Sequence, residues 1–276
     1  MPWFENRLGE QLWYEDAGCG IPLLFLHGWC MSSAVWQGQF GGLDNDSFRL
    51  IAPDLRGHGH SRCVSGQIEF ERFADDLSDL AKFLDLAGVI LIGWSMGAQI
   101  AIQAYQDLAD RLTGLVLVSA TPSFTAKEGY PFGLTSNEAS GMRLKVQRNI
   151  DRAMHGFHAR MFADGELESF QLAELVTGLL ASVIPPETDV ALAALDALVE
   201  ADMRSLLAEI RIPTLVMNGD RDPICLPQAS DYMADHIELV RHTVFPGCGH
   251  APFMTRSEQF NCEITSYAGS VCDRIA

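Results

Sequence analysis

The sequence has few basic residues and no apolar run long enough to cross a membrane. Its 19 lysines and arginines stand against 36 aspartates and glutamates, which gives a formal net charge of -17. A protein of this charge repels phosphate, which argues against nucleic acids and anionic membranes as partners. No segment approaches the ~18 apolar residues needed to span a bilayer, and residues 1–18 lack the apolar core of an export signal. The sequence therefore predicts a cytoplasmic protein.

Paired cysteines are missing as well. The seven cysteines show no Cys-x-x-Cys spacing and stand at positions 19, 30, 63, 225, 248, 262 and 272. An odd, scattered set favours reduced thiols over a disulfide framework. Cys248 and His250 have metal-ligand chemistry, but no second pair of ligands accompanies them, so we expect no metal.

What the sequence does contain is enough apolar residues, 48% of 276, for a large core. Short apolar runs, each followed by turn residues, indicate strands buried on both faces of a parallel sheet. These runs are Leu23–Leu26, Phe48–Ala52, Val89–Ile92, Leu115–Val118, Thr214–Met217 and His242–Phe245. Helical periods separate several of them, as in Phe70–Leu86 and Ala98–Leu108. The alternation predicts an α/β fold with a mostly parallel sheet flanked by helices, and Trp3–Tyr14 is expected to add an antiparallel pair at one edge.

The alternation stops between residues 123 and 204, where only helical periodicity is found. We expect an inserted helical cap of three or four helices there, with residues 1–122 and 205–276 forming the α/β core. One amphipathic period runs through residues 143–160, with an apolar stripe that includes Val146, Ile150, Met154, Phe157 and Met161.

Ser95 stands between two glycines, in the pattern Gly93-Trp-Ser-Met-Gly97, directly after one predicted strand and before one predicted helix. This setting is typical of a nucleophile elbow, a strained turn whose neighbours must be small. The turn also places the hydroxyl at a helix N-terminus, which favours a developing anion. Ser95 is therefore the predicted nucleophile.

A serine hydroxyl needs a base to accept its proton and an acid to orient that base. His250 lies in a glycine-rich loop after the last predicted strand and is the predicted base. The loop after Thr214–Met217 offers two acids, Asp220 and Asp222. We prefer Asp222, because it lies further beyond the end of the strand, and we expect Asp220 to brace the loop.

The oxyanion formed by an attacked ester needs two backbone N–H donors. The residue after the nucleophile, Met96, is expected to supply one, and Trp29, in the loop after the first parallel strand, the other. The Trp29 side chain is then free to line the substrate pocket.

On these motifs the sequence resembles the α/β-hydrolase family over nearly its whole length. The residues that carry the resemblance are His27-Gly-Trp29, Asp54-Leu-Arg-Gly-His-Gly-His-Ser61, Gly93-Trp-Ser-Met-Gly97, Gly219-Asp-Arg-Asp222 and Gly249-His250. The resemblance implies an α/β-hydrolase fold, a hydrolase with a helical cap over its site, and no metal or organic cofactor.

A narrower resemblance concerns the pimeloyl-acyl-carrier protein methyl ester esterases of biotin synthesis. It is carried by Leu26-His-Gly-Trp29, Gly93-Trp-Ser-Met-Gly97, Ser119-Ala-Thr-Pro-Ser-Phe124 and Gly249-His-Ala-Pro-Phe253. It implies hydrolysis of a methyl ester at the end of an acyl chain that an acidic acyl-carrier protein holds. Small-molecule esters are expected as further substrates.

One segment of the predicted cap is basic, whereas the rest of the chain is acidic. Residues 143–160 hold five basic residues and one acid, a local net charge of +4. Lys145, Arg148 and Arg152 lie opposite the apolar stripe, and Arg160 flanks it. These four are candidates for carrier docking, although a solvated helix face is an equally simple interpretation. Phe157 and Met161 are candidates for lining an acyl channel, or for core packing.

Other functions share parts of this pattern. A general short-chain carboxylesterase, or a lactone or carbon–carbon-bond hydrolase, would use the same triad and would not need a basic patch on the cap. A dehalogenase of this fold would carry aspartate at position 95, and a non-catalytic ligand-binding relative would not need an intact triad. The sequence carries no pattern that indicates the length of the acyl chain or the oligomeric state of the protein.

Overall fold

The computed structural model describes residues 2–62 and 67–272 and has an eight-stranded sheet at its centre. The strands are β1 (Trp3–Glu5), β2 (Gln11–Gly18), β3 (Ile21–Leu26), β4 (Phe48–Pro53), β5 (Val89–Trp94), β6 (Leu112–Val118), β7 (Thr214–Gly219) and β8 (Val240–Phe245). Their order across the sheet is β1-β2-β4-β3-β5-β6-β7-β8. The sheet is mostly parallel and β1–β2 forms an antiparallel pair at its edge, as predicted. The β2–β4 pair is antiparallel as well, which was not predicted.

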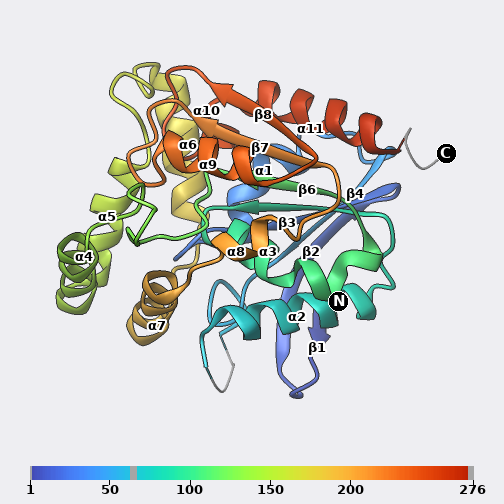
Figure 1. The fold of residues 1–276 in the computed structure, drawn as a ribbon, viewed down its shortest axis with the longest axis horizontal. Coiled ribbons are helices and arrows are strands. Elements are labelled where there is room, and N and C mark those ends of the chain that lie inside the picture. Colours follow the sequence, from blue (N-terminus) through green and yellow to red (C-terminus); the bar gives the residue numbers. More distant parts are fainter. Residues whose placement is uncertain (1, 63–66, 273–276) are drawn as a thin grey trace.

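Helices cover both faces of the sheet. In Figure 1, α2 and α3 lie below the sheet and α11 lies above it. The helices of this core are α1 (Gln37–Phe40), α2 (Phe70–Phe83), α3 (Met96–Leu108), α8 (Arg204–Leu207), α9 (Pro227–His236), α10 (Pro252–Thr255) and α11 (Ser257–Cys272), with short 3-10 helices at Ser33–Trp36 and Ala109–Arg111.

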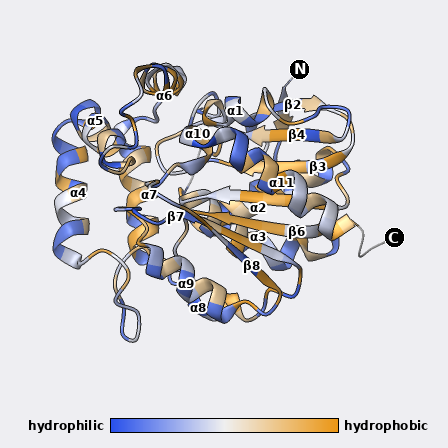
Figure 2. Cartoon of the chain, turned by 90° about the horizontal axis from the view of Figure 1, so that it is seen from above, coloured by the Kyte–Doolittle hydropathy of each residue, from blue (hydrophilic) through white to orange (hydrophobic). Residues whose placement is uncertain are grey.

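Alternate side chains of the central strands enter two different hydrophobic clusters. Leu24 and Leu26 of β3 pack in the cluster with α2 and α3, whereas Leu23 and Phe25 pack with α11 and the first 3-10 helix. Successive residues of a strand point to opposite faces, and both faces here are covered. This is why the strands read as continuous apolar runs (Figure 2).

Between β6 and β7, residues 136–207 form helices without a named strand. Four longer helices, α4 (Ser136–Arg148), α5 (Ile150–Arg160), α6 (Phe170–Ser182) and α7 (Thr188–Glu200), precede α8. In Figure 1, α4, α5 and α7 stand to one side, away from most of the sheet. We call residues 123–204 the cap; the division into cap and core stays a prediction.

One expectation for the cap is wrong. The amphipathic period of residues 143–160 does not belong to a single helix, because the helix breaks at Asn149, whose backbone is extended at φ -166° and ψ 102°. Its side chain accepts a hydrogen bond from Arg152 N at 2.8 Å and caps α5. Asparagine competes for backbone donors in this way and therefore favours a new N-terminus over continued helix. Lys145 and Arg148 thus lie on α4, and Arg152 and Arg160 on α5.

No helix in the described part of the chain is long and apolar enough to cross a membrane. The six cysteines within the described ranges are free: Cys19, Cys30, Cys225, Cys248, Cys262 and Cys272. The seventh, Cys63, lies outside the described residues.

Candidate active site

Ser95 lies in a sharp turn between β5 and α3. Its φ of 55° and ψ of -116° are unusual for a residue with a side chain. The turn is closed so tightly that a Cβ at Gly93 would stand 2.4 Å from the carbonyl oxygen of Gly97, and one at Gly97 2.4 Å from that of Leu26. Ser95 N also donates to Val118 O on the neighbouring strand, at 3.0 Å. The two glycines and the hydrogen bond to the sheet together hold Ser95 in its strained conformation at the end of β5.

His250 and Asp222 meet in the loops that follow β8 and β7. His250 Nδ1 lies 2.8 Å from Asp222 Oδ2, and both side chains are buried. The other oxygen of Asp222, Oδ1, accepts hydrogen bonds from the backbone N–H groups of Ile224 and Cys225, at 2.8 and 3.0 Å. The carboxylate is therefore fixed by three donors in an orientation that directs it at the imidazole.

This contact sets the proton positions on His250. A carboxylate can only accept, so Nδ1 carries the proton and Nε2 has a free lone pair in the neutral ring. Nε2 is buried and has no hydrogen-bond partner among the described residues. The backbone of His250 is held too, because its carbonyl accepts from Trp94 Nε1 at 2.8 Å. The ring is thus presented as an oriented acceptor.

Cys225 is a neighbour of Ser95 that sequence reasoning did not identify. Its thiol interacts with the Ser95 hydroxyl, and burial, with a further contribution from Asp222, raises the pKa of the Cys225 thiol well above its usual value. The thiol therefore stays protonated and is no rival nucleophile. No local pattern marks this cysteine, since its position depends on how the Asp222 loop folds back.

Asp220 is near the same loops but makes a different contact. Its Oδ1 accepts a hydrogen bond from Gly247 N at 2.6 Å, which ties the end of β7 to the loop after β8. Asp222 and not Asp220 is therefore the carboxylate beside His250.

The loop after β3 brings Trp29 close to Ser95. A Cβ at Gly28 would lie 3.4 Å from Ser95 Cβ, so the backbone of this loop borders the serine directly. Neither Trp29 N nor Met96 N donates to another group in the described part of the chain. Two N–H groups beside the turn are thus free for a ligand oxygen.

A cavity of about 700 Å³ lies between Trp29 and helices α4 and α5. The Trp29 and Phe157 rings meet edge to face with centroids 5.3 Å apart, and Trp29 Nε1 donates to Ala191 O of α7. Met161 is fully buried and does not line this cavity. The wall combines apolar with basic side chains: Trp29, Leu134, Met142, Val146, Met154 and Phe157 with Lys145, Arg148, Arg152 and Arg160.

The basic residues of this cavity differ in what they bind. Lys145, Arg148 and Arg152 are exposed and form no ion pair with any residue in the described ranges. Arg160 donates to the carbonyl of Pro223, at 3.1 Å, beside Asp222. Arg143, by contrast, is paired with Asp196 of α7. Four basic side chains without an ion pair among the described residues, together with one acid, Glu138, therefore line the cavity.

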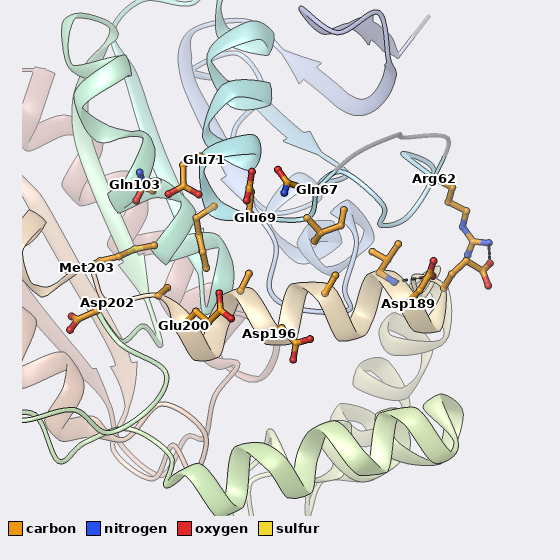
Figure 3. Close-up of a pocket in the computed structure, with 17 residues that line it drawn as sticks. Arg62, Gln67, Glu69, Glu71, Gln103, Asp189, Asp196, Glu200, Asp202 and Met203 are labelled. Carbon is orange, nitrogen blue, oxygen red and sulfur yellow. Dashed lines mark hydrogen bonds and ion pairs between the residues drawn. The ribbon is translucent and has the colours of Figure 1, made fainter.

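A second cavity, of about 910 Å³, lies between α7 and the N-terminal side of α2, and acids are seven of the 17 residues that line it (Figure 3). None of Ser95, Asp222 and His250 lines it. Several of its acids already have partners, as Glu187 has in Arg62 and Asp202 in Arg204. Within the described residues, no group of three or more histidine, cysteine or acidic side chains could hold a metal ion.

The comparisons with known proteins agree with this geometry. A family model described as alpha/beta hydrolase fold matches residues 21–257. The chain is 33% identical over 249 residues to the pimeloyl-acyl-carrier protein methyl ester esterase of Nitrosomonas europaea, covering 89% of this chain and 95% of the relative. It is 30% identical to the non-heme chloroperoxidase CPO-A1 of Kitasatospora aureofaciens, covering 97% and 99%. The solved esterase EaEST from Exiguobacterium antarcticum superposes with a TM-score of 0.89 at 27% identity, covering 97% and 98%.

Proposed function

Because the chain belongs to the alpha/beta hydrolase fold family, we propose that it is a serine carboxylesterase with Ser95, His250 and Asp222 as its catalytic residues. The observation that carries this proposal is the buried 2.8 Å contact between His250 Nδ1 and Asp222 Oδ2, which leaves Nε2 as a free acceptor. An acceptor of this kind activates a serine hydroxyl when the two groups come within hydrogen-bond reach.

The reaction proceeds in two halves. The Ser95 hydroxyl gives its proton to His250 Nε2, and Oγ attacks the ester carbonyl. His250 then returns the proton to the alkoxy group, which leaves as the alcohol, and an acyl-enzyme remains on Ser95. Water attacks this acyl group while His250 accepts a proton from it, and His250 then gives that proton to Ser95 Oγ, which leaves the acyl group, so that the carboxylic acid and free Ser95 result. Asp222 stabilises the imidazolium in both halves.

The oxyanion of each tetrahedral intermediate is bound by the N–H groups of Trp29 and Met96. Both border Ser95, and neither has another acceptor in the described residues. Donors of this kind are worth about 10²–10³ in kcat, because they are directed before charge develops.

The substrate proposed is the methyl ester of pimeloyl-acyl-carrier protein, cleaved to pimeloyl-acyl-carrier protein and methanol in biotin biosynthesis. The relative from Nitrosomonas europaea carries the name of this activity. The cavity beside Trp29 and Phe157 suits an acyl chain, and Lys145, Arg148, Arg152 and Arg160 suit an acidic carrier at its mouth. No contact of the Met161 side chain supports a substrate role for it. A cytoplasmic location belongs to the same proposal.

A general short-chain carboxylesterase is the second candidate. It is favoured by the similarity to EaEST over nearly the whole length of both chains. Such an enzyme would use the same triad, and it would not need the free charges of the cap.

Kinetics on two kinds of substrate test the proposal. p-Nitrophenyl esters of increasing chain length are compared with a carrier-bound pimeloyl methyl ester, using the wild type and Ser95→Ala. We expect a higher kcat/KM for the carrier-bound ester, no turnover by Ser95→Ala, and labelling of Ser95 by a serine-directed phosphonate. Activity in Ser95→Ala would overturn the mechanism, and a preference for free short esters would favour the second candidate.

A further inference from the structure

A buried carboxylate of the cap is bonded to the loop that carries His250. Glu166, only 5% exposed, lies between α5 and α6. Its Oε2 accepts hydrogen bonds from Gly249 N at 2.7 Å and from Ala163 N at 2.8 Å, and its Oε1 accepts one from the Thr255 hydroxyl. One side chain thus joins the cap to both sides of His250.

The backbone around this carboxylate is packed without spare room. His250 N donates to Met161 O at 2.6 Å. Two consecutive N–H groups, those of Gly249 and His250, therefore donate hydrogen bonds to residues of the cap. A Cβ at Gly249 would stand 2.4 Å from Met161 O and 2.8 Å from Ala163 N. The segment 161–166 and the His250 loop are therefore in direct backbone contact.

We propose that Glu166 is a positioning residue that holds His250 in line with Ser95. This inference rests on the proposed function, because it concerns the base of that triad. Hydrogen bonds from N–H groups to a buried carboxylate are stronger than those to a neutral acceptor. Without this acceptor, the Gly249 N–H is left unsatisfied in a buried place, and the loop shifts to satisfy it. A displacement of about 1 Å between reacting groups costs up to ~10²-fold in rate.

Three substitutions of Glu166 separate the effect of its hydrogen bonds from the effects of its charge and of its side-chain length. Glu166→Leu keeps the size and removes both acceptors. Glu166→Gln keeps one acceptor for the two N–H groups, and its NH₂ can donate to the Thr255 hydroxyl, which can turn to accept. Glu166→Asp keeps the charge but shortens the reach by one methylene. Glu168→Leu, two residues away and exposed, is the matched control.

The readouts are kcat and KM for a small uncharged ester, with active sites counted by phosphonate labelling and folding checked by near-UV circular dichroism. We expect kcat per labelled site to fall about 10–100-fold in Glu166→Leu and less in Glu166→Asp, by the displacement argument above. KM should change less than about twofold, Glu166→Gln should stay within about threefold of the wild type, and Glu168→Leu should match it.

The results distinguish failure of the positioning role of Glu166 from failure of the proposed esterase function. Unchanged kcat per labelled site in folded Glu166→Leu, in an enzyme that Ser95→Ala inactivates, overturns the positioning role and leaves the proposed function in place. If Glu166→Leu does not fold, a wild-type kcat in Glu166→Asp overturns the role, and a reduced kcat with unchanged KM supports it. A fall of Glu166→Gln as deep as that of Glu166→Leu overturns the hydrogen-bond account. Activity in Ser95→Ala removes the proposed function itself.

Discussion

His250 Nδ1 and Asp222 Oδ2 are 2.8 Å apart, although the two residues belong to loops after different strands. The loops meet because β7 and β8 are parallel neighbours, which end at the same edge of the sheet. A Cβ at Gly219 would stand 2.1 Å from Cys248 O, so the loops touch already at the end of β7. The pair is therefore set by the sheet, and burial keeps water away from both partners.

The first prediction compares the two aspartates of this loop. Asp222→Asn should lower kcat by up to ~10⁴, because an amide can donate to Nδ1 and so stabilise the wrong tautomer of His250. Asp220→Asn removes the charge from the contact with Gly247 N but keeps an acceptor oxygen there, so kcat should fall less than about tenfold, as expected for an exposed substitution that preserves its hydrogen bond. Steady-state kinetics on a p-nitrophenyl ester give both values. The reverse ranking would contradict the assignment of Asp222 as the acid.

The second prediction concerns the room around the turn at Ser95. Gly97→Ala should destabilise the protein by about 1–3 kcal/mol or more, and abolish esterase activity, because its Cβ meets the backbone of β3. Gly178→Ala, in the middle of α6 and with nothing within 4 Å of its Cβ, should instead add up to ~1 kcal/mol. Urea unfolding measures both. Equal effects of the two alanines would show that the turn has more space than the structure gives it.

Much of this fold could be predicted from the sequence because its central strands are buried on both faces, whereas the edge strand β8 is not. β5 is a continuous apolar run that ends in a glycine-flanked serine, so strand, turn and helix could each be predicted from neighbouring residues. The fold class is confirmed by the sheet and by the family model. The roles of Ser95, Asp222 and His250 stay predictions, although the structure brings the last two into contact.

What sequence reasoning missed depends on contacts that no local pattern encodes. The break at Asn149 was hidden, because the apolar period continues from α4 into α5 in the same phase, while a single side-chain hydrogen bond starts a new helix. Glu166 contacts Gly249 across 83 residues. In the sequence it is one acid among 36 aspartates and glutamates. Its importance arises only from where the chain folds back.

The third prediction follows from two buried histidines beside the site. His58 Nδ1 donates to Arg56 O, and burial, with a smaller contribution from His27, lowers the pKa of His58 from 6.5 to about 3. Burial also lowers the pKa of His27. Below pH 6.5 the unfolded chain therefore binds protons that the native protein does not. The contribution of these neutral histidines to the free energy of unfolding is fully present above pH 6.5. It is lost as the pH falls toward 3, by up to ~1.4 kcal/mol per pH unit for each such group.

Urea unfolding at pH values from 7 to 4 tests this dependence. The free energy of unfolding of the wild type should fall as the pH is lowered, and that of His58→Gln should fall less steeply, whatever its value at pH 7. His155→Gln, on the exposed face of α5, serves as the control and should keep the wild-type slope. A slope in His58→Gln equal to that of the wild type would mean that His58 is protonated in the native protein.

The last prediction concerns the free charges of the cap. Arg148 and Arg152 line the cavity beside Trp29 and have no ion pair within the described residues, so replacing both with Glu breaks no internal salt bridge. The double variant should lower kcat/KM for a carrier-bound ester by about 10-fold or more, because it replaces attraction for an acidic protein with repulsion. Hydrolysis of a small uncharged ester should stay within about twofold, since exposed substitutions away from reacting groups have small effects. Arg143→Glu together with Asp196→Arg reverses an existing pair and is the matched control, because it leaves the local net charge unchanged.

Salt gives an independent measure of the same interaction. Exposed charges are screened over ~10 Å at 0.1 M ionic strength, so raising salt should slow the wild-type carrier reaction and leave the Arg148→Glu, Arg152→Glu variant less affected. Equal losses on the carrier-bound and the small ester would place the damage in the pocket rather than in docking. If neither substrate responds to the substitutions, the charges form an ordinary solvated surface, and the free short-chain ester becomes the better-supported substrate.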